Sequence, residues 1–293
     1  MPVDPKGTLD KLGKGEKVKP DLVDTGGGKF VPAKSIKEAT EYAKKYIARK
    51  VNFGEIDLEV ANEVNGTLKK LITDKGRAKL GGLLYGGDKL RATAQVDGDR
   101  IVMSHWMKNK KLIDASFGVN SGRVGFIKDR LSEYREELRD GGIDWRTDAL
   151  YKKKKIRFDK AVQETRDAKN RREYVANNAG SLITHEFGHI QENRAVARAL
   201  DGIPEGNMEE MMAAMRKLRK ASPDKLLNDK KVADTISVYA RTNDSEHLAE
   251  AYVAWKEGLG DRVHPDVLAW VKKLDADDIE AGITPADPKE EIF

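Results

Sequence analysis

Apolar residues recur along much of the chain at the spacing of amphipathic helices, and one stretch alternates with the period of a strand. Residues 176–199 contain no proline and carry a helical apolar stripe made of Leu182, Ile183, Phe187, Ile190 and Val196. Residues 90–104 surround an Asp-Gly pair, which predicts a β-hairpin. The pattern therefore predicts an α+β fold that is rich in helix and has a small sheet or hairpin.

Capping and breaker residues predict the ends of further helices. Ser35 and Glu38 have the spacing of a capping box, and Gly76 is typical of a helix end. The predicted helices cover residues 35 to about 49, 57 to about 73 and 207–221, and helices of mixed charge follow a turn-rich stretch at 118–125 up to residue 170.

Charged residues are frequent, but their two signs nearly cancel. The chain has 54 Lys and Arg against 49 Asp and Glu, for a formal net charge of +5. The densest basic run, residues 152–155, lies among acidic residues and is typical of the solvated face of a helix. With few aromatic residues to stack on bases and no recognised nucleic-acid motif, a nucleic-acid partner is not expected.

The chain contains no cysteine, which excludes disulfides and thiolate metal ligands. It has no apolar run of transmembrane length and no secretory signal. We therefore expect a protein of the producing cell's cytoplasm that has no membrane partner.

Residues 185–189, His-Glu-Phe-Gly-His, form an H-E-x-x-H pattern within the predicted helix. Residues four apart share one helix face, so His185 and His189 would direct their imidazoles to a common point. That arrangement suits Zn²⁺, and Glu186 beside the open coordination position would act as general base toward a water molecule. The motif predicts a zinc-dependent hydrolase, most commonly a peptidase.

A catalytic zinc ion needs a third protein ligand. The pattern with a third histidine is excluded because Glu192 and Ala195 occupy the positions of its Gly and His. The other source is a carboxylate on a second helix, which residues 242–244 are predicted to cap. Glu246 and Glu250 share one face of that helix, and either could be the ligand.

The two segments together resemble the catalytic domain of anthrax lethal factor and its relatives, which are gluzincins, the zinc peptidases with a glutamate ligand. Those proteins carry H-E-F/L-G-H on one helix and Y-x-R/x-T-N-x-x-E-x-x-A-E-A on the next. The matching residues of the second segment are Tyr239, Arg241, Thr242, Asn243, Glu246, Ala249, Glu250 and Ala251. The resemblance covers these two segments and implies a zincin-like metallopeptidase fold.

On this resemblance, Glu246 is the third zinc ligand. Tyr239 would donate its phenol proton to the oxyanion, and Glu250 would orient a ligand histidine. Two alternatives stay open, because Glu250 could replace Glu246 as the ligand and Tyr239 could be a buried aromatic residue without a chemical role. His247 points away from this helix face and is expected to be a packing residue or an exposed ring.

The chain is expected to comprise an arm and one domain. Residues 1–34, rich in Lys, Asp, Gly and Pro, predict a flexible basic arm. Residues 35–293 would form the zincin-like domain, with helices and the hairpin in a lobe of residues 35–145 and the metal-binding helices in residues 146–293. Zincins hold an extended peptide along an edge strand, for which residues 100–104 are the candidate.

A weaker resemblance concerns residues 34–71, which look like segments of phage head-morphogenesis and virion-associated proteins. The principal hypothesis is a zinc endopeptidase that acts on a protein or peptide substrate. The first alternative is a virion or prophage component that contacts other virion proteins. The second is a toxin or effector protease that cleaves a host protein.

Overall fold

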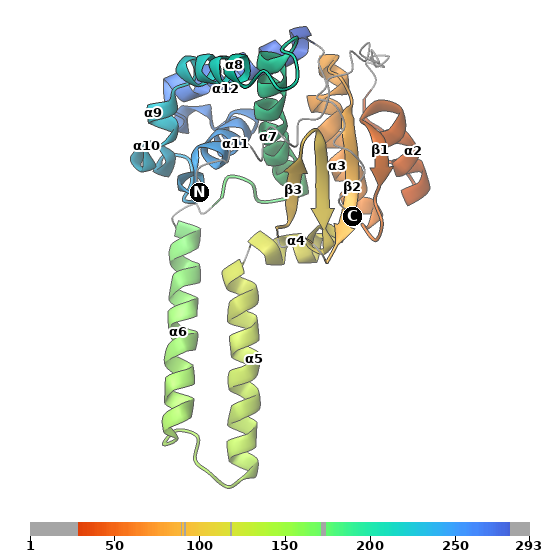
Figure 1. Ribbon diagram of the computed structural model, residues 1–293. Helices are drawn as coiled ribbons and strands as arrows, with labels where there is room; N and C mark the ends of the chain where they lie inside the picture. The colour runs from red at the N-terminus through yellow and green to blue at the C-terminus, as the bar shows by residue number, and fades with distance from the viewer. Residues whose placement is uncertain (1–28, 89, 91, 118, 171–173, 282–293) are drawn as a thin grey trace. The chain divides into compact units, whose positions relative to one another are not determined.

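The computed structural model describes residues 29–88, 90, 92–117, 119–170 and 174–281 (Figure 1). Most of the predicted arm, residues 1–28, lies outside this range. The chain divides into two compact units, of which one contains the segments up to Ile113 and from Tyr174 onward and the other contains residues 114–173. The lobe boundary expected after residue 145 falls inside the second unit. Helices predominate and the sheet is small, so the fold class is α+β, as predicted.

The first unit contains a four-stranded sheet and most of the helices. Its strands are β1 (Ala48–Asn52), β2 (Leu80–Gly87), β3 (Ala94–Asp97) and β4 (Arg100–Ser104). Its α-helices are α2 (Ile36–Tyr46), α3 (Leu58–Leu71), α7 (Ala179–Leu200), α8 (Met208–Ala221), α9 (Asp224–Leu227), α10 (Lys230–Asp234), α11 (Asp244–Lys256) and α12 (Pro265–Ala281), and α4 (Lys110–Phe117) ends in the other unit. Short 3₁₀ helices are η1 (Thr73–Lys75), η2 (His105–Met107), η3 (Tyr239–Arg241) and η4 (Gly260–Arg262).

The sheet has the order β1-β2-β4-β3, with parallel pairs β1–β2 and β2–β4 and an antiparallel β3–β4 hairpin. Asp97 pairs with Arg100, so the predicted hairpin closes through two residues, and the first of them, Gly98, has φ 60°. The prediction that residues 100–104 form the edge strand was wrong. Strand β2, which was not predicted from the sequence, pairs with β4 on the side away from β3, so the edge strands of the sheet are β1 and β3.

The helix predicted to end near residue 49 ends earlier, at Tyr46. Its start was confirmed, since the Ser35 side chain accepts a hydrogen bond from the Glu38 backbone N–H. The chain then enters β1, where Ala48 pairs with Leu80 of β2. The other predicted helices of this unit, α3, α7, α8 and α11, were confirmed to within a few residues of their expected ends.

Helix α7 lies between the sheet and helices α11 and α12, and it also packs on α3 and α8 (Figure 1). Its N-terminus has a reciprocal capping box between Asn178 and Ser181. Most of its residues are buried, including Phe187 and Ile190, which have no exposed surface. The helix that carries the H-E-x-x-H pattern is therefore fixed on several sides by the core.

A network of buried charges joins α7 to the sheet and to α12. Arg194 donates to Asp99 in the β3–β4 turn at 3.0 Å and to Asp278 of α12 at 3.1 Å. Arg77, just before β2, pairs with Asp275 of α12 at 2.5 Å. These five side chains are at most 7% exposed. Burial raises the pKa of Asp99 to about 6, although the positive charge of Arg194 opposes the shift.

The second unit is a pair of long helices, α5 (Val119–Asp140) and α6 (Ala149–Asn170). A small apolar cluster of Leu131, Leu138 and Tyr151 holds them together. The turn-rich stretch predicted at 118–125 was wrong from residue 119 onward, because α5 begins there. The basic run 152–155 lies on α6 and is largely solvated, as predicted, and Lys155 forms an ion pair with Asp159. No helix in the described ranges combines the length and apolar character needed to cross a lipid bilayer.

Candidate metal centre

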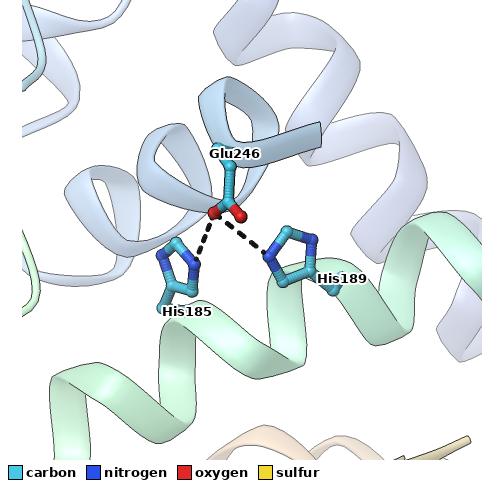
Figure 2. A group of neighbouring side chains, drawn as sticks. All are labelled: His185, His189 and Glu246. Carbon is cyan, nitrogen blue, oxygen red and sulfur yellow. Dashed lines mark hydrogen bonds and ion pairs between the residues drawn. The ribbon is translucent and has the colours of Figure 1, made fainter. Parts of the chain in front are cut away.

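The structure brings His185, His189 and Glu246 together (Figure 2). The histidines project from adjacent turns of α7, and Glu246 reaches them from the first turn of α11. Its Oε2 atom lies 3.1 Å from His185 Nε2 and 3.4 Å from His189 Nε2. Asn243 caps α11 by accepting a hydrogen bond from the Glu246 backbone N–H, which fixes where this carboxylate leaves the helix.

Small residues allow α7 and α11 to approach closely at this point. A Cβ atom added to Gly188 would lie 2.9 Å from the Cα of Ala249 and 3.2 Å from the Cβ of Tyr252. A side chain at position 188 would therefore push the helices apart. Gly188, between the two histidines in the motif, lets the carboxylates of α11 reach the imidazoles of α7.

The three side chains fit a metal ion. They offer two imidazole nitrogens and one carboxylate oxygen, all within 4.8 Å of one another. Ligands at about 2.0–2.1 Å from a metal in a tetrahedral arrangement are about 3.3 Å apart, close to the 3.1 and 3.4 Å that separate Glu246 from the two imidazoles. Two histidines and one carboxylate are also a ligand set that catalytic zinc sites use.

His185 is held on both sides of its ring. Its Nδ1 lies 3.0 Å from Oε1 of Glu250, whose other oxygen accepts a hydrogen bond from the Val175 backbone N–H. Burial alone would lower the pKa of His185, but hydrogen bonds to Glu246 and Glu250 outweigh it and raise the pKa to about 10. At Glu246, the hydrogen bonds to His185 and His189 and the positive charges of these rings outweigh burial and hold the pKa of its carboxyl well below the ordinary value.

His189 is held differently. Its Nδ1 lies 3.0 Å from the Ser245 hydroxyl, which in turn donates a hydrogen bond of 2.5 Å to Oε2 of Glu192. Neither Ser245 nor Glu192 was predicted from the sequence to belong to the site. Helical spacing could have indicated Glu192, which follows His189 by three residues, but the contact with Ser245 depends on how two helices meet.

Two further predicted residues lie beside the group. Glu186 is only 5% exposed, and burial raises the pKa of its carboxyl although His185 and His189 oppose the shift. The ring of Tyr239, at the start of η3, lies 5.8 Å from that of His185. Burial, the negative charge of Glu246 and a hydrogen bond with it raise the pKa of the Tyr239 phenol.

No significant match was found among protein-family models, curated proteins or solved structures. The predicted residues His185, His189, Glu186, Glu246, Glu250 and Tyr239 nevertheless gather at one place. His247, expected to be a packing residue or an exposed ring, is fully buried against α9, where its Nδ1 lies 2.9 Å from the Leu227 carbonyl oxygen. It takes no part in the group.

Proposed function

We propose that this protein is a zinc-dependent endopeptidase of the gluzincin type, with a zincin-like fold. The observation that carries the proposal is the convergence of His185, His189 and Glu246, with the buried carboxyl of Glu186 next to the first histidine. The likeness of the two motif segments to the lethal factor family agrees with it. Glu246 would be the third ligand, and Glu250 would orient His185.

The chain's own residues supply the acid–base chemistry of peptide hydrolysis. When bound, a zinc ion would acidify a water molecule and polarise the carbonyl of a peptide bond. Burial raises the pKa of Glu186, which makes this carboxylate a better base for the water's proton and then an acid for the leaving amine. The raised pKa of Tyr239 keeps its phenol protonated at neutral pH, so it can donate to the oxyanion.

The sheet offers a surface for an extended substrate. Strand β3 forms an edge of the sheet and packs against α7, and Asn193 of α7 donates a hydrogen bond to the carbonyl of Gly98 in the adjoining turn. A peptide added beside β3 would form main-chain hydrogen bonds with that strand. It would then lie next to α7, the helix that carries the histidines. This supports an unfolded or extended protein segment as substrate.

The proposal is tested with Glu186→Gln and zinc-loaded protein. We expect the variant to keep its zinc ion, since the amide fills the same space, and to lose hydrolysis of a peptide library by about 100-fold or more, because it cannot accept a proton. Metal content is measured by elemental analysis and cleavage by mass spectrometry. Glu209→Gln, an exposed position on α8, is the matched control and should behave as wild type.

Two results would contradict the proposal. Zinc-loaded wild type that cleaves no member of a broad peptide library would favour the alternative of a virion component that carries this fold without catalysis. Equal cleavage by wild type and Glu186→Gln would remove Glu186 from the chemistry.

A further inference from the structure

The Nδ1 atom of His189 is joined to a carboxylate through a hydroxyl group. Ser245 Oγ lies 3.0 Å from Nδ1 and 2.5 Å from Glu192 Oε2. His189 and Glu192 both belong to α7, and Ser245 of α11 contacts both of them. The Ser245 hydroxyl therefore bonds across the interface between the two helices, while Asn243 caps the N-terminus of α11.

The contacts determine which nitrogen of His189 carries its proton. A carboxylate can only accept, so the single proton of the Ser245 hydroxyl is donated to Glu192. The oxygen of that hydroxyl is then left to accept, and its partner Nδ1 must carry the imidazole proton. In the neutral ring, which is the form that binds a metal, Nε2 then keeps its lone pair on the side that faces Glu246, 3.4 Å away.

We infer that Glu192 and Ser245 are positioning residues that hold His189 in the tautomer and ring orientation required for metal binding through Nε2. The inference rests on the proposed zinc site and adds a second support for its ligands. His185 receives this support directly from Glu250, whereas His189 receives it through Ser245. Because Ser245 directly precedes Glu246, the same contact also fixes the start of α11 against α7.

The test measures zinc affinity of the full chain by competition with a chromogenic chelator. Ser245→Ala is expected to weaken zinc binding by about 10–100-fold, the usual effect of losing a partner that orients a ligand. Glu192→Gln should weaken it also, because an amide can donate to the hydroxyl and allow the reverse tautomer. Ser245→Thr keeps the hydroxyl and should bind zinc with the affinity of wild type. Ser222→Ala, which removes an exposed hydroxyl bonded to the Arg219 carbonyl, is the control.

A second measurement does not depend on any variant folding. In zinc-loaded wild type, ¹H–¹⁵N correlation spectra should show the His189 proton on Nδ1 and ligation through Nε2. A proton on Nε2, or wild-type zinc affinity in both Ser245→Ala and Glu192→Gln, would overturn the inference. If wild type binds no zinc, both this inference and the proposed function are wrong. If it binds zinc but cleaves no peptide, only the peptidase activity is contradicted, and the zinc affinities of the Ser245 and Glu192 variants still test the inference.

Discussion

Among individual residues, the two glutamates of α11 have different positions relative to the histidines. Glu246 faces the Nε2 atoms of both rings, whereas Glu250 is fully buried behind His185 and contacts its Nδ1. Only one of the two carboxylates can therefore reach an ion held by both imidazoles. The other controls the ring that binds it.

This difference predicts unequal effects of two similar substitutions. Glu246→Ala should abolish tight zinc binding because it removes a ligand, and Glu250→Ala should weaken binding by about 10–100-fold because it removes an orienting partner. Metal content and affinity of the purified variants check this. Loss of the metal in Glu250→Ala with its retention in Glu246→Ala would reverse the assignment.

His247 makes stability depend on pH. Burial lowers its pKa from 6.5, although a hydrogen bond to the Leu227 carbonyl opposes the shift. The unfolded chain then binds a proton more readily than the folded one, so the stability linked to this group is present above pH 6.5 and is lost as the pH falls below it. His247→Phe should reduce the slope of unfolding free energy against pH in this window by at most about 1.4 kcal/mol per pH unit. Urea unfolding at a series of pH values measures it, and an unchanged slope would contradict the assignment.

Among the elements, the contact between α7 and α11 depends on Gly188. Gly188→Ala should destabilise the protein by about 1–3 kcal/mol and weaken zinc binding, because the added methyl group would separate the helices that carry the ligands. Gly260→Ala is the matched control, since a Cβ there meets its nearest neighbour at an ordinary 3.6 Å. Thermal unfolding and chelator competition report the two effects. Gly188→Ala with wild-type affinity would show that the helix spacing does not control the site.

The helices that carry the site could be predicted because their signals are local. The apolar stripe of α7 and the capping residues 242–244 before α11 lie within these elements or directly beside them. Strand β2 escaped prediction because its sequence, LGGLLYGG, is half glycine and its partners in β1 and β4 lie outside the segment. The role of Ser245 was missed for the same reason, since only the packing of α7 on α11 brings it to His189.

At the scale of the whole first unit, buried charges link the sheet, α7 and α12. Arg194→Met would leave Asp99 and Asp278 buried without this partner and should cost about 3–5 kcal/mol of unfolding free energy. Arg219→Met removes the Arg219–Asp224 pair on the surface and should cost less than about 1 kcal/mol. Urea unfolding of both variants measures the difference. Equal losses would show that the buried network contributes no more than an exposed pair.

Arg77 has a consequence for how the chain is made. Its guanidinium, with no exposed surface, donates to the Asp275 carbonyl, 198 residues later, as well as pairing with the carboxylate of that residue. At about 5–20 residues per second, Asp275 is synthesised some tens of seconds after Arg77. Until then the guanidinium lacks its partners on α12, and closing the sheet over it would cost several kcal/mol of desolvation. We therefore expect the core around α7 to be completed only after the α12 segment has left the ribosome, so that this unit finishes folding late in synthesis.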